Sequence, residues 1–282
     1  MAEQRCAPQV EDEAETSFSS RNTTTAFKVL VFSRTEGYRH ASIPAGIAAL
    51  EGLATLSKRS PTPFTVHATE DALVFKSPTL AQYRVVIFLQ SSGEFFDNKV
   101  QLHALQGFVR AGGGIVAVHC ASTGLPSSAY YGRLIGAVFD GHPEPQQGVV
   151  VIEDPTHPIV SSVSAFTYTS KVTKQERASA SQDVSSDVAG DAVEYQIEWF
   201  DEWYNFRQNP RMLDGVHILM SVKESTYQGG IMGEDHPIAW CQEFDGGRSF
   251  YTALGHFDEA YTDDLFKTSI LNGILWAAQI TG

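Results

Sequence analysis

The 282-residue chain has few cysteines and little basic charge. Only Cys6, Cys120 and Cys241 occur, and no two of them form a CxxC pair, so neither a disulfide framework nor a cysteine-based zinc site is indicated. Such cysteine usage is typical of a reducing, cytoplasmic setting. The formal net charge of -13 argues against a nucleic-acid partner, because binding phosphates requires a basic face.

Long apolar runs and several common catalytic signatures are also absent. Without an apolar run of membrane-spanning length or a signal-peptide core, we expect neither secretion nor a membrane partner. The sequence contains no Walker A, HExxH or GxSxG pattern, which argues against P-loop NTPases, HExxH metalloproteases and standard α/β-hydrolases. The glycine run at 112–114 precedes an apolar segment instead of following one, so it is not a dinucleotide-binding loop.

Composition divides the chain into three kinds of segment. Residues 1–26 are rich in Glu, Ser and Thr, and we expect a mobile N-terminal arm there. Residues 27–282 have the apolar content of a single domain. Within them, the segment at about 169–194 is rich in Ser and poor in apolar residues, which indicates a solvated insert.

Apolar segments alternate with helical patterns through the first half of the domain. Strands are predicted at 27–33, 64–69, 83–90 and 115–119, and Asp97 is expected to cap the helix that precedes the last of these. This order predicts an α/β fold with a doubly wound, mostly parallel sheet. The less regular second half adds strands at 148–154, 216–222, 237–244 and 248–254, a hairpin turn at 245–247 and a helix at 263–279.

Candidate site residues follow the predicted strands. Arg39 and His40 come after the first strand, and His119 ends the fourth. In an open parallel sheet, ligands bind beyond the carboxyl ends of the strands, so we expect these loops to converge on a site. His256 follows the strand at 248–254, and His142 lies shortly after the His119 loop, so both are expected to line the same pocket.

The segment 201–206, DEWYNF, places two carboxylates beside aromatic rings. A carboxylate held in a partly dry pocket suits general acid–base catalysis, and Glu202 is the candidate. We expect Asp201, Trp203 and Tyr204 to bind substrate beside it.

Cys120 directly follows His119, which raises the question of a Cys–His catalytic pair. Neighbouring residues on an extended strand point to opposite faces, so the two side chains are expected to be poorly placed to share a proton. Cys120 is therefore interpreted as a buried residue of the pocket wall and not as a nucleophile.

Six segments in order resemble the ThuA-like family, named for trehalose utilisation: GYRHASI (37–43), AGGGIVAVH (111–119), YGRLIGAVFDGHP (131–143), DEWYNF (201–206), HPIAW (236–240) and FYTALGH (250–256). The resemblance runs from about residue 27 to 278. It implies a flavodoxin-like fold of the class I glutamine amidotransferase-like superfamily. In the amidotransferases a cysteine nucleophile follows a central strand; here His119 stands at that position, so glutaminase activity is not expected.

The resemblance implies an enzyme acting on a carbohydrate, keto-sugar or similar polyoxygenated small molecule by hydrolysis, elimination or isomerisation. His40, His119 and Glu202 would move protons, while Arg39 and Tyr38 would help to bind substrate. Two alternatives stay open, a tailoring enzyme of a specialised-metabolite pathway and a non-catalytic sugar-binding protein. No cofactor is expected, although His40, His119, Glu202 and His256 also suit zinc, and a homo-oligomer is a further open alternative.

Overall fold

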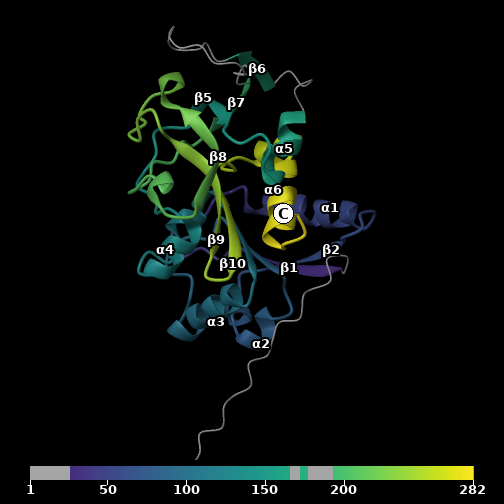
Figure 1. Cartoon of the computed structure of the whole chain (residues 1–282). Coiled ribbons are helices and arrows are strands. Elements are labelled where there is room, and N and C mark those ends of the chain that lie inside the picture. The colour runs from purple at the N-terminus through teal and green to yellow at the C-terminus, as the bar shows by residue number, and fades with distance from the viewer. Residues whose placement is uncertain (1–25, 166–171, 177–192, 282) are drawn as a thin grey trace, which may run out of the picture.

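The structure, a computed structural model, describes residues 26–165, 172–176 and 193–281 (Figure 1). Residues 1–25 of the predicted arm at 1–26 and most of the predicted insert at 169–194 lie outside the described residues. The described strands are β1 (Phe27–Phe32), β2 (Phe64–Thr69), β3 (Val85–Leu89), β4 (Gly114–Val118), β5 (Gln146–Ile152), β6 (Val172–Glu176), β7 (Val193–Asp201), β8 (Val216–Lys223), β9 (Pro237–Phe244) and β10 (Gly247–Thr252). The α-helices are α1 (Ile43–Ser57), α2 (Ser77–Leu80), α3 (Lys99–Arg110), α4 (Ala129–Ile135), α5 (Pro158–Ala165) and α6 (Asp264–Ala277).

The described strands form one mixed sheet in the order β2-β1-β3-β4-β10-β9-β8-β5-β7-β6. Neighbours from β2 to β10 pair in parallel, whereas every pair from β10 to β6 is antiparallel. The prediction of an α/β fold is therefore confirmed, but the prediction of a mostly parallel sheet is wrong for its second half. There, hairpins and long returns replace the helical crossovers that parallel neighbours need.

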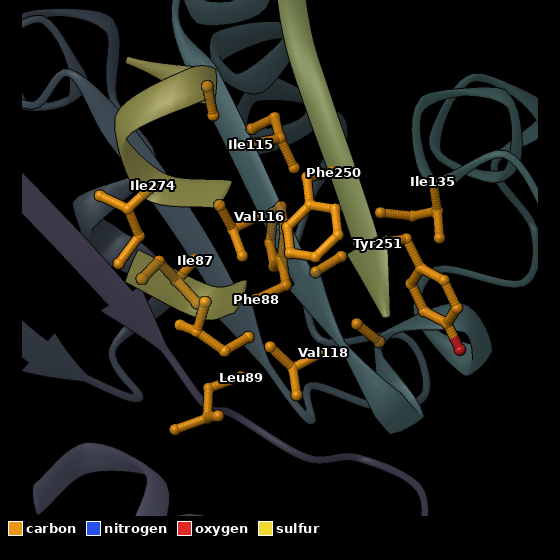
Figure 2. Packing of buried hydrophobic residues seen from close by; sticks show 14 of the residues in the cluster. Ile87, Phe88, Leu89, Ile115, Val116, Val118, Ile135, Phe250, Tyr251 and Ile274 are labelled. Atoms are coloured by element: carbon orange, nitrogen blue, oxygen red, sulfur yellow. The ribbon is translucent and has the colours of Figure 1, made fainter. Parts of the chain in front are cut away.

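Helices cover both faces of the parallel half, as the buried apolar strands require. On β3, Ile87 points toward α1 and α6, while the ring of Phe88 packs edge-on against Tyr131 of α4 at a centroid distance of 5.3 Å. Figure 2 shows the same division, with Ile274 of α6 beside Ile87 and Ile135 of α4 on the opposite side. The parallel half is thus clamped between two helical layers, which fixes the positions of its strand ends.

Most predicted elements match the structure within two residues, and the exceptions are informative. The cap of α3 is Asn98, not Asp97; its side chain accepts hydrogen bonds from the backbone N–H groups of Val100 and Gln101. The hairpin between β9 and β10 is confirmed, with positive φ at Asp245 and at the following glycine. Strand β7 was not predicted, and β6 falls within the segment interpreted as an insert. Among the described residues no helix combines the length and apolarity needed to cross a bilayer.

Candidate functional site

Four chain segments meet beyond the sheet edge where β4 and β10 end. His40 lies in the loop after β1, His119 directly follows β4, His256 comes four residues after β10, and Glu202 directly follows β7. Their ligand-type atoms, one per side chain, all lie within 4.8 Å of one another. The structure therefore brings together the three residues predicted to move protons, and it adds His256, which was predicted to line the pocket.

His119 sits on a strained turn. Its φ of 51° lies in the left-handed region that a non-glycine residue rarely adopts, and it begins a short 3₁₀ segment after β4. The expectation that His119 and Cys120 lie on an extended strand is therefore wrong. The hydroxyl of Tyr251 donates to the carbonyl of His119, and Nδ1 of His119 contacts the carbonyl oxygen of Ala253 at 2.5 Å. Both contacts come from the β10 region, so the neighbouring strand holds the turn in place.

The Glu202 carboxylate is the centre of the cluster. Its Oε2 lies 3.0 Å from Nδ1 of His256, 3.3 Å from Nε2 of His119 and 3.9 Å from Nε2 of His40, and its Oε1 lies 3.5 Å from Nε2 of His142. None of the first three nitrogens has a hydrogen-bond partner among the described residues, because these approaches lack hydrogen-bond geometry. The side chains of His40, His119, His256 and Glu202 therefore direct these atoms into the space between them without forming direct hydrogen bonds to one another.

Burial makes this cluster electrostatically unusual. His119 is fully buried, His40 is 3% exposed and Glu202 is 8% exposed. Burial is the main reason that the pKa of His40 falls to about 4, and the nearby imidazoles of His119 and His256 lower it further. Burial alone would raise the pKa of Glu202, but its contacts with the imidazoles of His119, His256 and His40 outweigh this and hold the pKa below its ordinary value. At neutral pH the cluster thus contains an ionised carboxylate and a neutral His40.

Asp201 fixes the backbone beside two of the cluster residues. It is 1% exposed, and its Oδ1 accepts hydrogen bonds from the backbone N–H groups of Glu202 and His256 at 2.9 and 3.2 Å. Its Oδ2 accepts from the Trp199 indole at 3.0 Å and from the Gly255 N–H at 2.9 Å. Although Asp201 was expected to bind substrate, the structure shows it tying together the two loops that carry Glu202 and His256.

Aromatic and imidazole rings surround the cluster. The ring of Tyr204 lies 4.2 Å from that of His119, centroid to centroid, and Tyr38 contacts the ring of His40 at 4.7 Å. His142 stands on the more open side, with its side chain 34% exposed. Its Nδ1 donates to the carbonyl of Pro143, which leaves Nε2 toward Glu202 without a proton in the neutral ring.

Three other predicted residues are not among the side chains that meet at Glu202. The Arg39 side chain is 49% exposed and forms an ion pair with Glu70 at 2.7 Å, so the structure does not bring its guanidinium to the imidazoles. The Trp203 indole is buried and donates to the carbonyl of Gln146. Cys120 is also buried, and burial raises the pKa of its thiol despite hydrogen bonds with Thr123 and Tyr204.

Two buried polar residues with positioning roles were not among the predicted site residues. Nε2 of Gln90, at the end of β3, lies within hydrogen-bonding distance of Ser42 Oγ, the Gly255 carbonyl and the Tyr261 hydroxyl, and so joins three loops around the site. His236 donates from Nε2 to the Tyr204 carbonyl at 2.8 Å. The strand-end rule could have identified Gln90. His236 begins the HPIAW segment of the family resemblance, but that segment does not indicate its hydrogen bond to Tyr204.

One family model matches the chain, and several solved structures share its fold. The sequence model of ThuA, described as trehalose utilisation, matches residues 28–177 and 169–277. A ThuA-like protein from Bacteroides uniformis has a similar structure, with a TM-score of 0.63 and 20% identity over 94% of this chain and 95% of that one. A ThuA-like protein from Parabacteroides merdae has a TM-score of 0.60 and 16% identity over 90% of each chain. A cytoplasmic protein of Salmonella typhimurium LT2 has a TM-score of 0.51 and 12% identity over 89% of this chain and 99% of that one. No curated protein matches.

Proposed function

Since the chain belongs to the ThuA family, whose description is trehalose utilisation, we propose that it is an enzyme acting on a carbohydrate, keto-sugar or similar polyoxygenated small molecule. The observation that carries this proposal is the buried Glu202 carboxylate, which four imidazoles approach within 3.9 Å. A structural ion pair needs one partner, and a set of four imidazoles around one carboxylate instead suits the repeated uptake and release of protons.

A neighbouring cavity supports a polyoxygenated substrate. It has a volume of about 650 Å³, and its wall includes Gln147, Glu198, Phe200, Phe257, Glu259 and Asp263. None of the four cluster side chains lines this cavity, but the ring of its wall residue Phe257 lies 4.3 Å from that of His256, centroid to centroid. Aromatic rings pack against the apolar face of a sugar while carboxylates accept hydrogen bonds from its hydroxyl groups.

The chemistry available to this centre is proton transfer at a carbon or oxygen of the substrate. Abstraction of a proton beside a keto group would lead to isomerisation or elimination, and protonation of a glycosidic oxygen would lead to hydrolysis. Neutral His40 accepts a proton, and ionised Glu202 stabilises an imidazolium that forms beside it. The proposal thus assigns one proton-transfer centre to all three reaction types. With Cys120 held as a buried thiol, thiol-dependent glutaminase chemistry is not part of the proposal.

The test is turnover of a sugar panel in heavy water, followed by proton NMR. The panel contains trehalose, other disaccharides and their 3-keto derivatives, because deuterium incorporation beside the keto group reports proton abstraction directly. We expect the wild-type protein to convert at least one compound. Glu202→Gln should lose roughly 10²–10⁴-fold in rate, the usual contribution of a general acid–base group.

Glu51→Gln, an exposed substitution on α1, is the matched control and should retain the wild-type rate. Phe257→Ala should raise KM more than it lowers kcat, because its ring belongs to the cavity wall and not to the proton-transfer centre. Full activity of Glu202→Gln would refute the proposal that Glu202 belongs to a proton-transfer centre. Tight binding of a panel sugar without any turnover would instead identify a sugar-binding protein.

A further inference from the structure

The four inward-facing side chains form a metal-ligand set. His40, His119 and His256 each present a ring nitrogen, Glu202 presents a carboxylate oxygen, and these atoms lie within 4.8 Å of one another. We propose that they bind one divalent metal ion of the zinc class. The inference rests on the proposed function in using the same side chains, and it changes their role, because His40 and Glu202 would hold the ion instead of moving protons. Metal binding can be measured without any substrate.

The orientation of His119 supports a cation between the side chains. Its Nδ1 contacts the Ala253 carbonyl, which can only accept a hydrogen bond, so Nδ1 carries the proton and Nε2 holds a lone pair in the neutral ring. In the neutral ring that lone pair faces Oε2 of Glu202 at 3.3 Å, which places two acceptors against each other unless a proton or another cation lies between them. A cation between the two atoms changes this repulsion into two attractive contacts.

Unpaired buried nitrogens supply a second, independent argument. Both ring nitrogens of His40, Nε2 of His119 and Nδ1 of His256 have no hydrogen-bond partner among the described residues, although His40 and His119 are at least 97% buried. Buried polar atoms in native proteins are nearly always satisfied, and a bound ion is a recognised partner for groups that find none in the protein. Three unsatisfied imidazoles that face one space require a common partner.

The spacing is also close to that of a metal site. Tetrahedral zinc with bonds of about 2.0–2.1 Å separates its ligand atoms by about 3.3 Å. The separations from Oε2 of Glu202 are 3.0 Å to His256, 3.3 Å to His119 and 3.9 Å to His40. Small rotations of the rings would therefore suffice to complete the coordination.

The surroundings also resemble those of a metal centre. Metal-binding histidines usually donate their second ring N–H to a carbonyl or carboxylate, as His119 does to Ala253. Asp201 fixes the backbone at both Glu202 and His256, two of the four ligands. His142 stays outside the set on the more open side, where its proton-free Nε2 can accept a proton from a substrate whose oxygen the ion polarises.

The experiment measures metal binding by the full chain. The purified protein is stripped with a chelator, titrated with zinc sulfate by calorimetry and analysed for metal content by mass spectrometry. Cobalt(II) chloride supplies an optical readout, since its visible absorption reports ligand number and type. We expect each chain to bind one equivalent of zinc. The visible absorption of the cobalt-loaded protein should be that of an ion with nitrogen and oxygen ligands.

Two conservative variants and one control complete the design. Glu202→Gln and His40→Gln should each weaken zinc binding at least 10-fold and change the cobalt spectrum while keeping the wild-type far-UV circular dichroism. His103→Gln, on the exposed face of α3, should bind zinc as the wild type does. Absence of stoichiometric binding of either ion, or wild-type affinity in both folded ligand variants, overturns the metal site.

The outcome is separable from that of the proposed function. Turnover that persists unchanged in chelator-stripped protein overturns the catalytic use of the ion and leaves the acid–base enzyme intact. Stoichiometric zinc binding without turnover of any panel compound supports the metal site while removing support for the proposed activity.

Discussion

Replacing Asp201 by Asn tests whether this carboxylate holds the site together. The two oxygens accept four buried N–H groups, those of Trp199 and Gly255 on Oδ2 and those of Glu202 and His256 on Oδ1. Asn has nearly the same shape but only one acceptor oxygen. In either orientation of the amide, its NH₂ group faces two N–H donors, which lose their partner.

The expected magnitude follows from that count. A buried donor left without an acceptor costs about 1–3 kcal/mol, so two cost about 2–6 kcal/mol in the free energy of unfolding. This is a large share of the roughly 5–15 kcal/mol that stabilises a typical domain. Urea unfolding followed by tryptophan fluorescence measures the change, with Asp214→Asn in an exposed turn as the control. If Asp201→Asn and the control both lie within about 0.5 kcal/mol of wild type with equal m-values, Asp201 is not the anchor.

Three further predictions concern other parts of the structure. Gly255→Ala should lose about 1–3 kcal/mol of stability in thermal melts, because φ is 114° there and a Cβ would lie 3.1 Å from the Phe266 ring. Iodoacetamide should label Cys120 slowly in native protein and rapidly in urea, since burial raises the pKa of its thiol; fast native labelling would contradict this. The Arg211 guanidinium lowers the pKa of the half-exposed Asp235 below its ordinary 3.8, so this carboxylate stabilises the fold above that value. Asp235→Asn should therefore lower the free energy of unfolding by less than about 1 kcal/mol at pH 7. In urea unfolding at a series of pH values, this difference from wild type should disappear as the pH falls below 3.8 and Asp235 becomes protonated.

The parallel half of the fold was predictable because its strands carry their signal locally. β3 and β4 are continuous apolar runs with every residue buried, β1 is interrupted only by the exposed Lys28, and helical patterns separate the three. The direction of pairing in the other half was not predictable from such patterns. β10 pairs in parallel with β4 and antiparallel with β9, and only contacts between distant segments decide where the hairpin joins the sheet.

Strand β7 shows a different reason for a missed element. Tyr195, Ile197 and Trp199 alternate with Gln196 and Glu198, which is the period of a half-buried strand. The strand begins at Val193, inside the segment at about 169–194 that was interpreted as an insert, so only its later part lies outside that segment. A narrower compositional window would have separated the two.

The site was predictable to the extent that it depends on the ends of strands. His40, His119 and His256 follow β1, β4 and β10, and the rule for open sheets brings them to one edge. Glu202 follows β7 in the antiparallel half, where the rule does not apply. The carboxylates beside aromatic residues in DEWYNF made it a candidate, but no local pattern places it beside the imidazoles. Arg39 follows the same strand as His40, yet it pairs with Glu70, because a rule about strand ends does not specify where a long side chain points.

The glycines before β4 serve packing. A Cβ on Gly113 would lie 2.4 Å from the ring of Phe108 in α3, and one on Gly114 would lie 2.4 Å from the backbone oxygen of Ala277 in α6. The two glycines therefore let helices from both faces approach the start of β4. This interpretation agrees with their position before the strand, where no phosphate-binding loop occurs.

Close packing at the start of β4 bears on the strain at its end. A non-glycine residue with φ near 51° costs about 1–3 kcal/mol and persists only where its surroundings determine its conformation. For His119 these surroundings are β4, clamped between α3 and α6, and β10, whose Tyr251 hydroxyl and nearby Ala253 carbonyl hold the backbone and ring. A relaxed extended residue would direct its side chain along the sheet normal, away from Glu202. The strained turn thus places the imidazole of His119 in the cluster. Helices α3 and α6, which pack on Gly113 and Gly114, stabilise this turn by fixing the start of β4.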